Sequence, residues 1–107
     1  MSGESKIIAS SDHLCRSKDG RTFTLSIALK APFYEEEKWV CPVLLKGWDN
    51  GERRIFGGDS LQALGLAMAF VRSELRILAE SGGQIIDPES GAVVDIESWI
   101  DCFAPSV

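Results

Sequence analysis

The stretch between residues 22 and 80 changes from an alternating pattern to a helical one, and this change limits the folds open to the chain. Within residues 22–30, large apolar side chains alternate with polar or small ones, which is typical of a strand with one buried face. From about Ser60 to Glu80 the apolar residues instead recur every three or four positions, which predicts one long helix. The chain is therefore expected to pack a sheet against a helix.

Both ends of the predicted helix are marked. Asp59 is a favoured N-cap with Gln62 three residues later, and Gly82 follows the last helical turn. One apolar stripe is expected to lie on the sheet: Leu61, Leu64, Met68, Val71, Leu75 and Leu78. A second stripe is expected on the far side of the helix: Leu66, Phe70 and Ile77, flanked by Ala63 and Ala67. Such a stripe must be covered, either by a C-terminal segment through Trp99 and Phe103 or by a second copy of the chain.

The segments before the helix predict a meander of four antiparallel strands. They are expected near residues 7–14, 22–30, 38–48 and 53–56, with Asp-Gly at 19–20 and Asn-Gly at 50–51 as turns. Glu35-Glu36-Glu37 is interpreted as an exposed connection. Pro42 has no N–H group to donate, so it is expected at a sheet edge or a bulge.

The residues after the helix predict a small hairpin and a short helix. Residues 84–86 and 92–94 flank a turn with Pro88 and Gly91, while Ile96, Trp99, Ile100 and Phe103 repeat at helical spacing before Pro105. The expected fold is α+β: a four-stranded antiparallel meander packed on one long helix, with a C-terminal hairpin and short helix. A single domain is predicted over residues 6–107, after a disordered stretch at residues 1–5.

Charge is distributed unevenly along this acidic chain. The net charge is −5, but residues 77–107 carry six acidic residues and no Lys or Arg. Such a segment repels a phosphate backbone, which disfavours nucleic acid and favours a basic protein as partner. The candidate partner surface consists of Glu89, Asp95, Glu97 and Asp101. The alternative is a solvated acidic surface that aids solubility.

The sequence shows no membrane span, no secretory signal and no metal-binding or catalytic motif. No apolar run approaches the roughly 20 residues that cross a bilayer, and no secretory signal opens the chain, so a cytoplasmic protein is predicted, without membrane contact. Cys15, Cys41 and Cys102 form no C-x-x-C pair, so neither a disulfide framework nor a zinc site is expected. His13, the one histidine, is not paired with a thiol by any motif. No catalytic residue, metal or cofactor is predicted, and the chain is not expected to be an enzyme.

The residues Gly57-Gly58-Asp59-Ser60-Leu61 resemble the serine attachment motif of acyl and peptidyl carrier domains. That resemblance implies a phosphopantetheine arm on Ser60 within an all-helical bundle. The alternation in residues 21–48 argues against such a bundle, and Gly57-Gly58 with Asp59 also suits an ordinary helix start.

A broader resemblance extends over residues 6–80. Trp39, Cys41-Pro42, Gly47 and Gly58-Asp59-Ser60-Leu61-Gln62-Ala63-Leu64 are similar to the pattern of a family of small bacterial proteins, a domain of unknown function. The resemblance implies a family and no activity.

The preferred hypothesis is a non-enzymatic protein-binding module, an acidic protein of the immunity or adaptor type that masks a basic partner. Its candidate surfaces are the acidic residues above and a helix interface at Leu66, Phe70 and Ile77, where the chain could form a homodimer. One alternative is a carrier domain modified at Ser60. Another is a small-ligand-binding domain that uses a groove near Trp39, Trp48 or Trp99, although core packing explains these tryptophans equally well.

Overall fold

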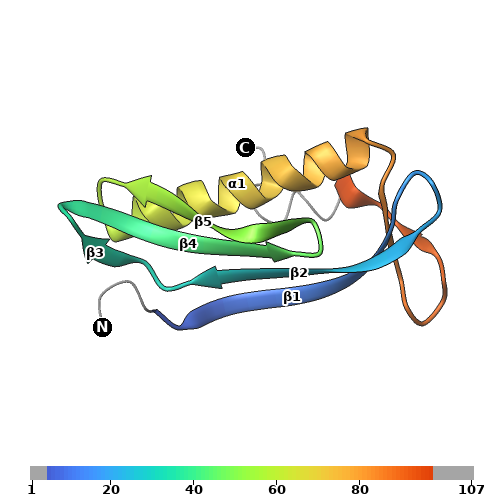
Figure 1. The fold of residues 1–107 in the computed structure, drawn as a ribbon, viewed down its shortest axis with the longest axis horizontal. Helices are drawn as coiled ribbons and strands as arrows, with labels where there is room; N and C mark the ends of the chain where they lie inside the picture. The colour runs from blue at the N-terminus through green and yellow to red at the C-terminus, as the bar shows by residue number, and fades with distance from the viewer. Residues whose placement is uncertain (1–4, 98–107) are drawn as a thin grey trace.

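The computed structural model describes residues 5–97, except for the side chain of Asn50, as one antiparallel sheet with one long helix (Figure 1). The strands are β1 (Ile7–Arg16), β2 (Thr22–Lys30), β3 (Phe33–Glu35), β4 (Lys38–Lys46), β5 (Asp49–Gly57), β6 (Gln84–Ile86) and β7 (Val93–Val94). The helix α1 (Ser60–Glu80) lies between β5 and β6 in the sequence. The predicted α+β class is confirmed.

The seven strands form a single sheet. Its order is β5-β4-β2-β1-β6-β7, and β3 follows β2 along the same side of β4. The predicted meander is confirmed in β1, β2, β4 and β5, and so is the hairpin of β6 and β7. This hairpin joins the sheet because β6 pairs with the end of β1. Within residues 5–97, β5 pairs only with β4 and β7 only with β6, so these two strands form the two ends of the sheet, while the short β3 also pairs only with β4.

The turn between β4 and β5 lies earlier than predicted. It is formed by Gly47 and Trp48, whereas Asp49, Asn50 and Gly51 belong to β5. Gly47 has φ of 94°, and a Cβ atom there would lie 2.1 Å from the carbonyl oxygen of Thr24. A contact with a different strand therefore fixes the turn at a glycine, against the local preference of Asn-Gly.

Two further predictions about the sheet need correction. Residues 33–35 form β3 rather than part of an exposed connection, and Glu36 and Glu37 make a tight turn with φ of 51° and 65°. Pro42 lies in the interior strand β4 and is buried, not at an edge. Pairing of β4 with β3 ends at Val40 and pairing with β2 begins at Val43, so the interruption at Pro42 accommodates a residue without an N–H group.

Helix α1 packs on β4 and β5 through a narrower face than predicted. Its buried residues are Ala63, Ala67, Val71, Leu75 and Leu78. Leu64 and Met68 are only partly buried and Leu61 is 77% exposed, so the prediction for Leu61 is wrong. Ala63 and Ala67, expected on the far side, instead touch the sheet. The reason is close approach, because a Cβ atom on Gly57 would lie 2.5 Å from the Ala63 nitrogen.

The C-terminal part after β7 is described only as far as residue 97. Ile96 is 7% exposed and joins the core. No short C-terminal helix is seen among the described residues, and Trp99, Ile100 and Phe103 of the expected helix lie outside them. The stretch at residues 1–5, expected to be disordered, also lies outside them except for Ser5. No helix in the described part of the chain is long and apolar enough to cross a membrane.

Candidate functional site

One side of α1 presents large apolar residues at the surface. Leu66 and Ile77 are 45% and 49% exposed, and Phe70 between them is partly buried against the core. Their spacing of four and seven residues places all three along one side of the helix. We call Leu66, Phe70 and Ile77 the apolar side of α1. Among the described residues, nothing covers these three side chains completely. Their coverage by a C-terminal segment or by a second copy of the chain stays a prediction.

The apolar side of α1 lies next to the edge strand β5. Gly57 touches the helix at Ala63, and the charge of Glu74 reaches Arg53. Glu74 lies one turn after Phe70, so this contact places the apolar side toward β5 rather than toward β2 and β1. The outer side of β5 pairs with no strand of residues 5–97. Helix side and strand edge therefore form one continuous surface.

The charged residues of β5 alternate between the two faces of the sheet. Arg53 lies on the helix face and forms an ion pair with Asp49, with 2.7 Å between Nε and Oδ2. This hydrogen bond lowers the pKa of Asp49, and it raises the pKa of Arg53 together with the charges of Asp49 and Glu74. The ion pair thus fixes the position of the Arg53 guanidinium on the helix face of β5.

On the opposite face, Glu52 and Arg54 each reach across β4 to a strand on its other side, β2 for Glu52 and β3 for Arg54. Glu52 accepts from Lys30 at 3.1 Å, and Arg54 donates to Glu35 at 2.6 Å. The sequence predicted a strand here as the last of the four-stranded meander, which places it at an edge, but only over residues 53–56. The strand is longer and runs from Asp49 to Gly57.

Ser60 is the first residue of α1 and is exposed. The predicted N-cap is confirmed, because the Asp59 carboxylate accepts from the Gln62 N–H at 2.7 Å. The Gln62 side chain accepts in turn from the Gly58 N–H, which completes a reciprocal cap. The strands before Ser60 differ from the helical bundle that the carrier resemblance implies, whereas the cap accounts for Gly58 and Asp59 without any modification.

The predicted acidic surface is spread over the last strands. Glu89 lies in the turn between β6 and β7, while Asp95 and Glu97 follow β7; all three are exposed. Glu97 lies 3.7 Å from a guanidinium nitrogen of Arg76 on α1, so part of its charge is balanced. Asp101 lies outside the described residues. Asp87 instead holds the turn, and hydrogen bonds from the Glu89 N–H and the Ser90 hydroxyl lower the pKa of Asp87.

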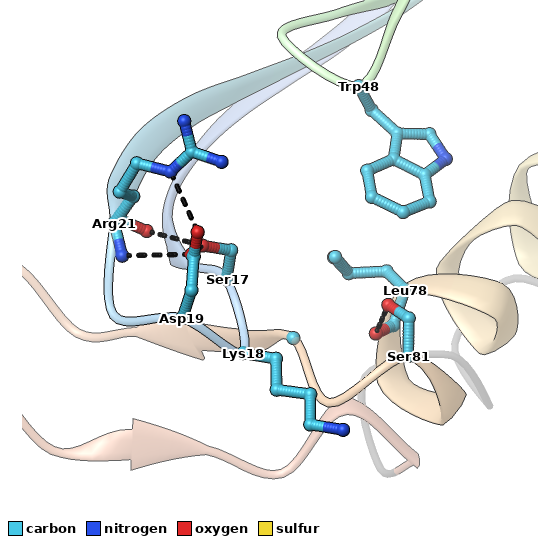
Figure 2. Close-up of a pocket in the computed structure, with 8 residues that line it drawn as sticks. Ser17, Lys18, Asp19, Arg21, Trp48, Leu78 and Ser81 are labelled. Atoms are coloured by element: carbon cyan, nitrogen blue, oxygen red, sulfur yellow. Dashed lines mark hydrogen bonds and ion pairs between the residues drawn. The ribbon is translucent and has the colours of Figure 1, made fainter.

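A pocket of about 490 Å³ opens at the end of the molecule where α1 ends (Figure 2). Figure 2 shows Arg21 and Asp19 from the β1–β2 turn on one side and Trp48 and Leu78 on the other. The Asp19 carboxylate is bound to Arg21 Nε at 2.9 Å; hydrogen bonds, chiefly from the Ser17 hydroxyl, lower the pKa of Asp19. Trp48 borders this pocket and Trp39, the other described tryptophan, does not; no sequence signal indicated the residues that Trp48 meets there.

The thiols and the histidine lie within the sheet. Cys15 and Cys41 are free and buried, and burial raises the pKa of both thiols. His13 lies two residues before Cys15 on β1, its Nε2 is 2.9 Å from the Ser11 hydroxyl, and burial lowers its pKa. In the part of the chain that the structure describes, no group of three or more His, Cys, Asp or Glu side chains could hold a metal ion. Cys102 lies outside that part.

Fold and surfaces together define a small α+β protein in which a long helix and a free strand edge share one exposed surface. The chain belongs to the family described as Domain of unknown function (DUF6968), whose model matches residues 12–91. That match runs from β1 through the turn after β6, so it includes β5 and α1. The predicted membership in a domain of unknown function is confirmed. Comparison with curated proteins and with solved structures gave no match.

Proposed function

We propose that this protein is a non-enzymatic, cytoplasmic protein-binding module, and that the apolar side of α1 with the adjoining edge of β5 is its main contact surface. The observation that carries the proposal is the half-exposure of Leu66 and Ile77 on either side of Phe70. Leaving large apolar side chains in water forgoes about 25 cal/mol per Å² of the area that a partner would bury. An edge strand beside them adds unpaired backbone groups that a partner can satisfy.

A site-specific photo-cross-linker tests this surface. Placed at Ile77, it should give a cross-linked protein product in cell extract, whether the captured protein is a second copy or another chain. The matched control is the same cross-linker at Leu61, which is more exposed, at 77%, but lies on another side of the same helix. Equal yields from the two positions, or none from Ile77, would refute the proposed surface.

The same module has a second surface suited to a basic protein, as expected of an acidic immunity-type or adaptor protein. Glu89, Asp95 and Glu97 are exposed at and after the β6–β7 hairpin, and Asp101 adds to their charge in the sequence. Binding through such a surface is fast at low salt and weakens as ionic strength shortens the reach of the field to about 8 Å.

Charge reversal distinguishes this surface from a solvated one. A variant with lysine at all four acidic positions should lose salt-sensitive binding to a basic partner and keep the fold, because exposed charges contribute little to stability. Reversal of Glu36 and Glu37, exposed in the β3–β4 turn, is the control. Unchanged binding of the fourfold variant would leave the acidic residues as a solvated surface.

A small-ligand function is the second candidate, and the pocket beside Trp48 favours it. Its volume of about 490 Å³ falls within the usual range of ligand sites, and Trp48 lies across from Arg21, whereas the Lys18 side chain points away from Trp48. An indole wall opposite a guanidinium suits a planar anion such as an aromatic carboxylate. Titration calorimetry with indole-3-acetate should give saturable heat that Trp48→Ala abolishes; absence of heat with the intact protein would remove this candidate.

The carrier alternative is the least supported. Incubation with a broad-specificity phosphopantetheinyl transferase and coenzyme A should leave the intact mass unchanged. A gain of one phosphopantetheine arm at Ser60 would replace the protein-binding proposal.

A further inference from the structure

We propose that the partner at the edge of β5 and the apolar side of α1 is a second copy of this chain, related by a two-fold axis that passes beside Arg53. This inference rests on the proposed function, because it names the occupant of the same surface. In such a dimer the two β5 strands pair antiparallel and the two sheets become one. The two helices then lie on the same face of the joined sheet.

The axis is placed at the middle of β5. The strand runs from Asp49 to Gly57, and Arg53 is its midpoint. Antiparallel pairing about Arg53 places Asp49 opposite Gly57 of the second copy. The ladder of β5 with β4 shifts register between Asp49 and Glu52, so the length of the strand does not by itself choose this centre; the charges beside Arg53 do.

Charges on the face opposite the helix match in this register. Glu52 and Arg54 flank Arg53, so the axis brings Glu52 opposite Arg54 of the second copy, and the reverse. Opposite charges directly across antiparallel strands are stabilising. If the two-fold axis instead passed beside Glu52 or Arg54, that residue would face its own copy, and two like charges would meet. The existing pairs to Lys30 and Glu35 extend the contact into a row of alternating charge.

The helix face contains one like-charge contact, between the two copies of Arg53. Each guanidinium is already bound by its own Asp49 and is reached by the charge of Glu74. Each guanidinium is therefore neutralised by its own Asp49, and Glu74 adds a further negative charge nearby. This balance allows the two arginines to approach.

Helix spacing is also compatible with the dimer. Helix α1 packs on both β4 and β5, so its axis lies between them, about one strand spacing from the two-fold axis. Two such helices are separated by about two strand spacings, close to 10 Å. Packed helices lie about 8–10 Å apart, so the two apolar sides meet without any shift of the sheet.

The apolar residues lie at the level that the axis requires. Gly57 touches Ala63, and Arg53 lies four strand residues away, a distance of about 13 Å or about nine helical residues. That distance leads from Ala63 to about residue 72, and the charge of Glu74 on Arg53 marks nearly the same level. The axis thus passes between Phe70 and Ile77, so that Phe70 of one copy lies near Ile77 of the other.

The described chain ends away from this surface. It leaves the sheet after β7, at the edge opposite to β5, and Glu97 then meets Arg76. The second copy is the occupant that satisfies both the strand edge and the apolar side.

A pair of charge-reversal variants tests the register. Glu52→Arg alone and Arg54→Glu alone each place like charges across the axis twice, so each should raise the dimer dissociation constant by about tenfold or more. Mixed in equal amounts, the two variants should form a heterodimer, because every contact between positions 52 and 54 again joins opposite charges. Native mass spectrometry with one isotope-labelled variant measures this mixture, and circular dichroism checks that each variant is folded.

Variants of the helix test the same interface independently of β5. Ile77→Glu should make the protein monomeric, whereas the control Leu61→Glu should leave the dimer unchanged. A monomeric intact chain, or a mixture without heterodimers, would overturn the dimer. In that case a cross-link from Ile77 to a different protein would keep the proposed function, and no cross-link at all would remove both.

Discussion

Substitution of Gly57 by alanine should be among the most damaging single-methyl additions in this protein. A Cβ atom at Gly57 would lie 2.5 Å from the nitrogen and 2.8 Å from the Cα of Ala63, whereas ordinary contacts are 3.4–4 Å. The first turn of α1 must therefore move by about 1 Å away from β5. Overpacking of this kind costs about 1–3 kcal/mol, and the upper end applies because the neighbours are backbone atoms rather than flexible side-chain ends.

Urea denaturation followed by circular dichroism measures this loss directly. A loss of about 3 kcal/mol is a large share of the 5–15 kcal/mol typical of a domain. The matched control is Gly65→Ala, where a Cβ atom meets nothing within 4 Å; this change should instead stabilise the helix by about 0.5–1 kcal/mol. If Gly57→Ala is as stable as wild type, the close contact between β5 and α1 is wrong, and with it the position of the apolar side.

Three other perturbations have defined outcomes. Asp59→Ala should cost about 1 kcal/mol through loss of the N-cap, and unchanged stability in chemical denaturation would show that Asp59 is not the cap. The folded protein binds a proton on His13 less readily than the unfolded chain, because burial lowers the pKa of His13 from 6.5. Stability should therefore fall as pH decreases below 6.5, and His13→Gln should flatten that dependence in thermal melts between pH 7 and 5; parallel curves for both proteins would contradict it. Truncation after Gly83 should destabilise the domain or make it aggregate, because it removes the buried Ile85 and Ile96; an unchanged melt of a monomeric truncated protein would contradict this.

The sequence predicts those elements whose signals are local. The alternation in β2 and the apolar repeat of α1 follow from periodicity, and the helix start follows from Asp59 with Gln62. The buried face of α1 was less predictable. Large apolar residues indicate which sides of the helix avoid water, but they do not indicate how closely the helix approaches the sheet. Ala63 and Ala67 face the sheet since only small side chains fit beside Gly57.

The candidate surface depends on how α1 lies on the sheet, which no local pattern encodes. The stripe Leu66, Phe70 and Ile77 and a last meander strand before the helix are both visible in the sequence, but their position side by side appears only from the contacts of α1 with Gly57 and Arg53. The turn at Gly47 was missed for a similar reason, because a contact with Thr24 on β2 determines it. The pocket beside Trp48 combines two turns and a helix end, and it too required the three-dimensional arrangement.

The mass of the intact chain in solution is the most direct measurement of whether the surface of β5 and α1 binds a second copy. Sedimentation velocity across a range of concentrations should give a mass near twice the 11.7 kDa of one chain, falling toward 11.7 kDa on dilution. A mass of 11.7 kDa at every concentration would contradict the dimer.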